Sequence, residues 1–252
     1  MRKFLKGEGE PELVVVGAIH GDEPAGKNAI ERVLNEDIKF QRPVKFIVAN
    51  QEALEKEERF VDRDLNDSFP GDPDSSQHEE RLAAEITEEV KGKTVIDLHS
   101  TRSTSEPFAT MKDTDEKTVE LLKHSGVERG ICFPSNSGVL IEQASNGLIV
   151  ETGVQGTENA EKDAYRILKN FLAAEQVIEE SYTTSEPELY RYIGTVEGDW
   201  RFEAENFRKV EKGETYASRK NDELVASESF YPVLMSTDGY EGKLGYKAEK
   251  IQ

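Results

Sequence analysis

The stretch Leu13-Val14-Val15-Val16-Gly17-Ala18-Ile19-His20-Gly21-Asp22-Glu23 is the most informative part of this 252-residue chain. Its first four residues are apolar and mostly β-branched, which predicts a buried central strand over residues 13–18. Pro24 to Leu34 then has the pattern of a helix, whose first turn tolerates the proline. His20 and Glu23 lie three residues apart in the connecting turn, so both side chains could face one cation. Alternatively, Glu23 caps the helix and His20 is incidental.

Further apolar segments alternate with amphipathic ones along the chain, which predicts an α/β fold with a mixed, mainly parallel sheet flanked by helices. Near Ser181 the pattern changes to short alternating runs separated by glycine and charged residues, which predicts a small β-rich C-terminal domain over residues 181–252 after a catalytic domain over residues 1–180. We expect strands at 44–49, 94–98, 130–133 and 147–150, a loop at 59–71, and helices from a cap within 74–77 to about 90, at 116–125 and at 158–179.

The composition limits what the chain can bind. The formal net charge is −19 and the sequence pI is about 4.7, so the surface repels nucleic acid and anionic membranes. No segment has the roughly 20 apolar residues of a membrane span, which predicts a cytoplasmic protein. The even spread of acidic residues favours a salt-adapted, halophilic surface over that of an ordinary acidic cytosolic protein. The one cysteine, Cys132, lies among apolar residues and is expected to be a buried thiol.

Two more candidate groups follow predicted strands, at the sheet edge where α/β folds place their chemistry. His99 closes the segment Val95-Ile96-Asp97-Leu98-His99, and Asp97 would face the same side of the strand and could orient the imidazole. Glu151 ends Leu148-Ile149-Val150, where a carboxylate is costly unless it is paired or functional. Taken singly, His99 could be a satisfied core histidine and Glu151 a cap or an ion-pair partner.

Four motifs in this order resemble the succinylglutamate desuccinylase and aspartoacylase family, a branch of the zinc carboxypeptidase-like hydrolases. They are Gly-x-His-Gly-Asp-Glu from Gly17, Arg-Phe-x-x-x-Asp-Leu-Asn-x-x-Phe-x-Gly from Arg59, Asp-Leu-His-Ser from Asp97 and Val-Glu-Thr-Gly from Val150. The resemblance implies one zinc ion per chain. The implied roles are zinc ligation by His20, Glu23 and His99, general base and acid for Glu151, carbonyl polarisation by Arg59, and site support and substrate contact for Asp64 and Asn66.

The sequence departs from the family pattern where the substrate carboxylate is expected to bind. Asp67 stands where Asp-Leu-Asn-Arg has its arginine, and residues 131–150 contain no arginine at all. Because a guanidinium suits a carboxylate and an aspartate repels one, carboxylate recognition is lost or relocated. Arg63 and Arg102 are the candidates for relocation, and Tyr240 is a candidate lining residue from the C-terminal part.

These features predict a zinc-dependent deacylase that cleaves the N-acyl amide bond of a small molecule. Asp67 argues against N-acetylaspartate and N-succinylglutamate and for a substrate with a neutral or cationic group. The alternatives are a metallocarboxypeptidase-type peptidase and a non-catalytic zinc-binding relative. A homo-oligomer is left open.

Overall fold

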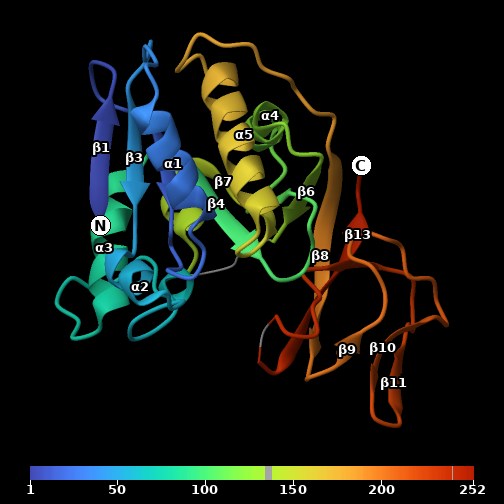
Figure 1. Cartoon of the computed structure of the whole chain (residues 1–252). Coiled ribbons are helices and arrows are strands. Elements are labelled where there is room, and N and C mark those ends of the chain that lie inside the picture. The colour runs from blue at the N-terminus through green and yellow to red at the C-terminus, as the bar shows by residue number, and fades with distance from the viewer. Residues whose placement is uncertain (134–137, 240) are drawn as a thin grey trace.

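A computed structural model describes residues 1–133, 138–239 and 241–252 (Figure 1). Its main feature is a ten-stranded mixed sheet with the strand order β1-β3-β2-β4-β7-β5-β6-β8-β13-β12. The strands are β1 Arg2–Lys6, β2 Leu13–Gly17, β3 Val44–Val48, β4 Thr94–Thr101, β5 Phe108–Met111, β6 Arg129–Cys132, β7 Asn146–Val154, β8 Glu188–Glu197, β12 Tyr231–Val233 and β13 Lys243–Lys250. The central neighbours β3, β2, β4 and β7 are parallel, so their carboxyl ends meet at one edge.

Helices cover both faces of the sheet, because alternate residues of the buried strands point to opposite sides. Leu13 and Val15 pack with α1 Ala25–Asn35, α4 Glu116–Ser125 and α5 Glu158–Ala174. Val14 and Val16 pack with the apolar stripe of α3 His78–Val90 on the other side. The three layers can be followed in Figure 1, where α1 and α5 lie in front of the strands. The predicted mixed, mainly parallel α/β fold is confirmed.

The structure corrects several predicted elements. The charged segment Gln51–Lys56 forms a short helix, α2, capped by the side chain of Asn50. The strands β1 and β5 were not predicted, since β1 is charged and β5 has only four residues. The helix α5 ends at Ala174 and not at Glu179. No side chain within 74–77 caps α3. The carboxylate of Asp62 accepts from the His78 amide instead, from a loop distant in sequence.

The C-terminal part continues the main sheet and adds a second one. The strand β8 pairs in parallel with β6, and β13 and β12 extend the same sheet. A separate three-stranded sheet contains β9 Arg201–Phe202, β10 Thr215–Arg219 and β11 Asp222–Val225. Its residues pack in their own apolar cluster around Tyr216 and Phe230. The antiparallel, β-rich character predicted for this part is therefore confirmed, while the boundary at residue 181 stays a prediction.

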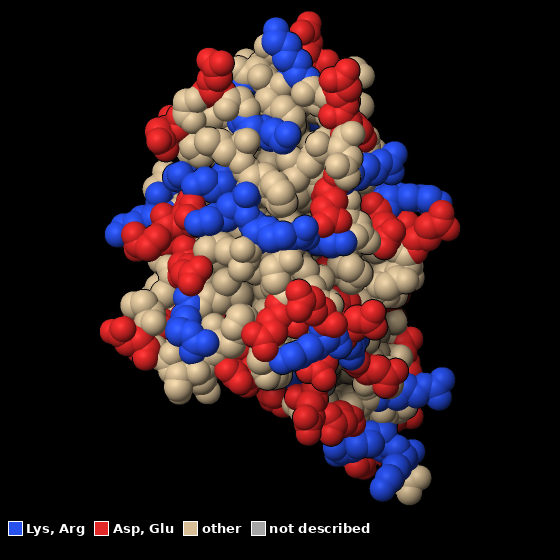
Figure 2. All heavy atoms as spheres, turned by 60° about the vertical axis from the view of Figure 1, so that its left-hand side comes forward, with Lys and Arg blue, Asp and Glu red and all other residues tan. Residues whose placement is uncertain are grey.

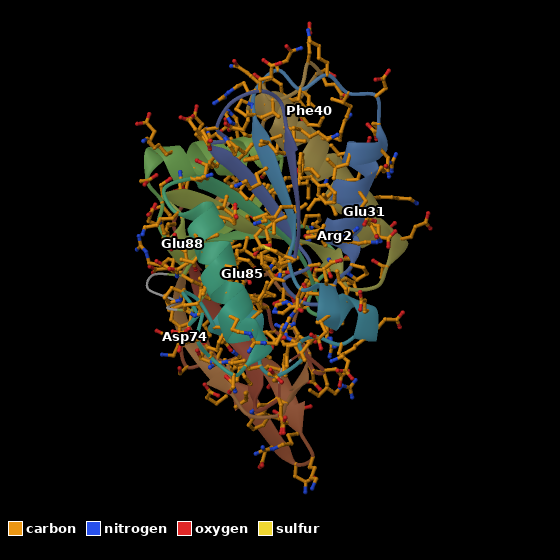
Figure 3. All side chains as sticks on the ribbon, turned by 90° about the vertical axis from the view of Figure 1, so that its left-hand side faces the viewer. Arg2, Glu31, Phe40, Asp74, Glu85 and Glu88 are labelled. Atoms are coloured by element: carbon orange, nitrogen blue, oxygen red, sulfur yellow. The ribbon has the colours of Figure 1, made fainter. Side chains whose placement is uncertain are left out.

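Acidic and basic side chains are interspersed on the face shown in Figure 2. Many of them pair across elements. Arg2 of the edge strand β1 lies beside Glu31 of α1 (Figure 3), and the distance between its Nη2 and Oε1 of Glu31 is 2.7 Å. Exposed pairs of this kind stabilise a fold by only about 0–1 kcal/mol each. Among the described residues, no helix is both long and apolar enough to cross a lipid bilayer. Salt adaptation stays a prediction.

Candidate metal centre and active-site pocket

The turn after β2 is shaped by two glycines that leave no room for a side chain. A Cβ atom on Gly17 would lie 2.8 Å from the carbonyl carbon of Gly26 in α1, and one on Gly21 would lie 2.1 Å from that of Ala53 in α2. The backbones of α1 and α2 therefore pack directly against the turn, and Ala18 between them has a φ of 58°. This packing holds His20 and Glu23, both almost fully buried, at the carboxyl edge of the sheet.

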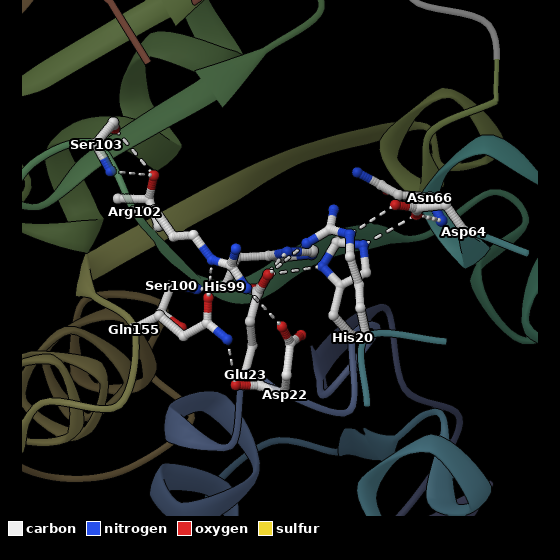
Figure 4. Close-up of polar contacts among 12 residues, drawn as sticks. His20, Asp22, Glu23, Asp64, Asn66, His99, Ser100, Arg102, Ser103 and Gln155 are labelled. Carbon is white, nitrogen blue, oxygen red and sulfur yellow. Dashed lines mark hydrogen bonds and ion pairs between the residues drawn. The ribbon is translucent and has the colours of Figure 1, made fainter. Parts of the chain in front are cut away.

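Glu23 lies between two imidazoles, one from the turn after β2 and one from strand β4 (Figure 4). Its Oε1 is 2.9 Å from Nδ1 of His20, and its Oε2 is 3.2 Å from Nδ1 of His99 in β4. One ligand atom from each of the three residues lies within 4.8 Å of the others. α1 has no side-chain cap, so Glu23 does not act as the helix cap that the sequence left open. Two imidazole nitrogens and one carboxylate oxygen fit a catalytic zinc ion, which takes three protein ligands of these types.

Each imidazole also has a carboxylate beside its other ring nitrogen, Nε2. Nε2 of His20 is 3.0 Å from Oδ1 of Asp64, and Nε2 of His99 is 2.9 Å from Oδ2 of the fully buried Asp97. A carboxylate at Nε2 favours a proton there and turns the Nδ1 lone pair toward Glu23. Both histidines are therefore oriented as metal-ligating histidines are, and Asp97 lies where its spacing to His99 suggested.

The charges of this group shift the pKa values of its members. Burial would lower the pKa of both histidines. At His20 the carboxylates of Glu23 and Asp64 outweigh burial and raise the pKa. At His99 the carboxylates of Asp97 and Glu23 raise the pKa well above its usual value. Burial would likewise raise the pKa of Glu23, but the two imidazoles hold it well below its ordinary range. The group therefore binds protons tightly at the nitrogens that would bind a cation.

Zinc uptake is expected to release protons and to tighten as the pH rises through neutrality. Because the pKa values of His20 and His99 are raised, both imidazoles keep their protons to a higher pH than free histidine does, and a cation must replace those protons. Calorimetric titration with zinc in buffers of different ionisation enthalpy, at about pH 6 and about pH 8, measures this. Equal affinity and no proton release at both pH values would contradict it.

Glu151 stands beside His99 on the neighbouring strand, as its register partner in the β4–β7 ladder. Its Oε2 atom is buried and has no hydrogen-bond partner among the described residues. Burial and the nearby charge of Glu23 raise the pKa of Glu151 to about 7, although His99, His20 and Arg59 act in the opposite direction. A carboxyl group with a pKa near neutrality can both accept and return a proton.

Arg59 reaches the same group from the loop that precedes α3. Its Nη1 is 3.0 Å from Oε1 of Glu23 and its Nε is 2.8 Å from Oδ2 of Asp64. Burial would raise the pKa of Asp64, but the hydrogen bond from His20 and the charges of His20 and Arg59 lower it far below its usual value. Arg59, Asp64 and His20 thus form one ionised network at the edge of the ligand group.

A cavity of about 330 Å³ opens beside Glu23 and Arg59. Its wall includes Arg102, whose Nη2 lies 3.4 Å from Asp22 and whose Nε lies 3.1 Å from Gln155 (Figure 4). The C-terminal part supplies the opposite wall. The remaining lining residues are Phe60, Ser100, Thr101, Ser103, Leu234, Ser236, Gly239 and Glu241.

The substrate-binding candidates occupy different places. Arg102 lines the cavity, whereas Arg63 does not: its guanidinium lies 2.5 Å from Glu80 of α3 and 3.3 Å from the carbonyl of Asp67. Asn66 lies beside Asp64, and its buried Oδ1 has no partner among the described residues. Asp67 is exposed and does not line the described cavity. Tyr240 lies outside the described residues.

The sequence interpretation missed several polar groups that surround this site. Gln155 follows β7 closely and donates to the carbonyl of Asp22 at 2.7 Å, so it fixes the turn that carries Glu23. Asn206 joins the C-terminal part to the cavity, because its Nδ2 donates to the carbonyls of Ser103 and Met235 at 2.9 and 2.8 Å. Gln155 could have been suspected from its place after a strand end. Nothing in the local sequence marks Asn206.

Curated relatives match only part of this chain. A succinylglutamate desuccinylase of Pseudomonas fluorescens (strain Pf0-1) is 35% identical over 77 residues, which are 29% of this chain and 23% of that protein. An N-acyl-aromatic-L-amino acid amidohydrolase (carboxylate-forming) of Xenopus tropicalis is 33% identical over 106 residues, 36% of this chain and 34% of that protein. The chain thus spans about a quarter to a third of the length of these curated relatives.

Solved structures match over nearly the whole chain. Murine aminoacylase 3 has a TM-score of 0.77 and 19% identity and covers 97% of each chain. A succinylglutamate desuccinylase/aspartoacylase of Rhodobacter sphaeroides has a TM-score of 0.77 and 17% identity over 98% of this chain and 89% of that one. At these identities the likeness shows the fold. The model of the succinylglutamate desuccinylase/aspartoacylase catalytic domain matches residues 9–174, most of the chain, and the protein therefore belongs to that family.

Proposed function

We propose that this protein is a zinc-dependent deacylase that hydrolyses the N-acyl amide bond of a small molecule. The observation that carries the proposal is the buried Oε2 atom of Glu151, which has no hydrogen-bond partner among the described residues and lies beside His99 and a three-ligand group whose Glu23 lines a cavity. An acid-base group beside an open ligand set is the arrangement that metal-assisted hydrolysis needs. Family membership and the names of the matching relatives support the same activity.

In the proposed reaction, His20, Glu23 and His99 would hold the zinc ion, which supplies Lewis-acid chemistry when bound. Glu151 accepts a proton from the attacking water as the new C–O bond forms, and it returns that proton to the amine as the C–N bond breaks. Arg59 lies next to Glu23, where its guanidinium can donate to the carbonyl oxygen as negative charge develops on it. Asp64 and Asp97 keep the imidazoles oriented throughout.

The cavity favours substrates that carry a single carboxylate. With Arg59 assigned to the acyl carbonyl, Arg102 is the remaining cation among the described lining residues. Glu241 adds negative charge to the wall, whereas Phe60 and Leu234 add apolar surface. Asp67, on which the sequence argument for a neutral or cationic group depended, does not line this cavity. We therefore propose that Arg102 and not Arg63 receives the carboxylate, and that the substrate is an N-acyl amino acid with an uncharged side chain.

N-acetylphenylalanine and N-acetylleucine are expected to be hydrolysed with kcat/KM values at least about 10-fold above that of N-acetylaspartate. The side-chain carboxylate of N-acetylaspartate would stay unpaired in a partly buried site, which costs about 1–3 kcal/mol.

Arg102→Gln should raise KM for the preferred substrates by about 10- to 100-fold and change kcat little, since it removes binding that ground and transition state share. A panel of N-acyl amino acids, assayed by amine release, measures both effects.

The matched control is Arg208→Gln, which removes a solvent-exposed arginine that pairs with Glu205 outside the cavity. Efficient turnover of N-acetylaspartate would refute the substrate proposal. An unchanged KM in Arg102→Gln would show that Arg102 does not bind the substrate carboxylate. Dipeptides in the panel test the peptidase alternative, and a zinc-loaded protein inactive on every member would favour the non-catalytic alternative.

A further inference from the structure

Glu79 is a fully buried carboxylate that contacts neither the ligand group nor the cavity. It belongs to the first turn of α3 and accepts hydrogen bonds from three successive backbone amides of the loop before that helix. Its Oε1 is 2.7 Å from the amide nitrogen of Val61, and its Oε2 is 2.9 Å from that of Asp62 and 3.3 Å from that of Arg63. A buried carboxylate is stable only where such donors satisfy it.

The contact between loop and helix runs in both directions. While Glu79 accepts from the loop, the carboxylate of Asp62 accepts from the amide of His78 at the start of α3. Nδ2 of Asn50 adds a fourth donor to Glu79 at 3.0 Å. The backbone N–H of Asn50 in turn donates to the carbonyl of Ala18 at 2.9 Å, in the turn that leads to His20. One buried carboxylate thus joins the loop, α3 and the backbone beside the ligand group.

The three clamped amides lie between the two residues of the loop that reach the ligand group. Arg59 precedes them and contacts Glu23, and Asp64 follows them and contacts His20. The carbonyl of Arg59 also accepts from the amide of Gly21 at 3.1 Å. Residues 61–63 are therefore the segment that links Arg59 to Asp64, and a shift of this segment would act on the positions of both.

We propose that Glu79 is a positioning residue of the active site, which holds residues 61–63 so that Arg59 and Asp64 stay aligned with the ligand group. The proposal deepens the proposed function and rests on it for its kinetic consequence. Burial would raise the pKa of Glu79, but the backbone amides and Asn50 outweigh it and lower that pKa, so the group is ionised. Glutamine has the same shape but offers one acceptor oxygen, and its amide group would face a backbone N–H.

The first test measures the loop itself and needs no substrate. In Glu79→Gln, the amides of residues 61–63 should exchange with deuterium about 10- to 100-fold faster than in the unchanged protein. Glu88→Gln is the matched control, because it removes the same charge from the exposed face of the same helix, as Figure 3 shows. Unchanged exchange in Glu79→Gln would overturn the clamp, whether or not the protein proves to be a deacylase.

The second test measures the consequence for turnover. With zinc loaded to the same level, Glu79→Gln should lower kcat by about 10- to 100-fold, since misplaced catalytic groups cost roughly that much, and Glu88→Gln should leave it unchanged. In an Arg59→Gln background, Glu79→Gln should lower kcat by a smaller factor than it does alone, because the part of its effect that acts through Arg59 is already lost. A lowered melting temperature with full kcat, or additive losses in the double variant, would make Glu79 a stabilising residue only.

Discussion

Replacing Glu151 with glutamine is expected to lower kcat by about 1,000-fold while the protein folds and still binds zinc. General acid-base catalysis contributes typically about 100- to 10,000-fold, and glutamine can neither accept nor return the proton. The proposed zinc ligands are on the neighbouring strand β4 and in the turn after β2, so the metal content should stay near one ion per chain. Steady-state kinetics together with a metal assay on the same sample checks both parts.

The same variant should be at least as stable as the unchanged protein above neutral pH when both are free of metal. Burial raises the pKa of Glu151 from 4.5 to about 7, so the folded state holds this proton more tightly than the unfolded state does. The stability that this proton contributes is fully present below about pH 4.5 and is lost as the pH rises through about 7, at a rate of at most about 1.4 kcal/mol per pH unit. Glutamine never ionises and avoids this loss.

Thermal unfolding at about pH 5 and about pH 8 measures the effect of Glu151 on stability, separately from its effect on kcat. Glu158→Gln serves as the control, because it removes an exposed carboxylate at the start of α5 that pairs with Lys162. That variant should keep both its kcat and its pH profile of stability. Hydrolysis retained by Glu151→Gln would exclude Glu151 from the mechanism. A variant that is inactive because it has lost zinc would make the role of Glu151 structural.

The predicted site residues that the structure brings together are those whose position follows from the strand to which they belong or which they follow. His20 follows β2, and His99 and Glu151 lie in β4 and β7, which are adjacent parallel strands of one sheet. Strand ends that share an edge bring such residues together, whatever separates them along the chain. The spacing of Asp97 and His99 on one strand also determined their contact, because residues two apart point to the same face.

The parts that could not be predicted depend on loops and on contacts between distant segments. Nothing near Glu79 in sequence indicates that its carboxylate holds residues 61–63, because α3 and the loop meet only once the chain has folded. Arg63 and Arg102 were equally eligible as carboxylate ligands in the sequence. The structure separates them, since Glu80 of α3 engages Arg63 whereas Arg102 lines the cavity. Loop backbones follow no simple period, so neither outcome could be derived from residue spacing.

Chelation of the metal is expected to abolish hydrolysis, by at least about 1,000-fold, and re-addition of zinc should restore it. The proposed reaction then loses its Lewis acid, and in addition the buried imidazoles of His20 and His99 take up protons in place of the cation. Added zinc at about 100 times its dissociation constant should also stabilise the folded protein by about 2.7 kcal/mol, which a thermal shift measures.

A pair of histidine variants tests whether that metal occupies the site assigned to it. His99→Gln should lose both zinc and activity, because His99 is one of the three proposed ligands and its Nδ1 faces Glu23. His124→Gln should lose neither, since His124 lies on α4 and pairs with Glu175 at 2.7 Å, apart from the ligand group. If the metal content and the chelator sensitivity survive in His99→Gln, the zinc ion that supports hydrolysis binds elsewhere. The contacts of Asp64 and Asp97 would then be ordinary buried ion pairs.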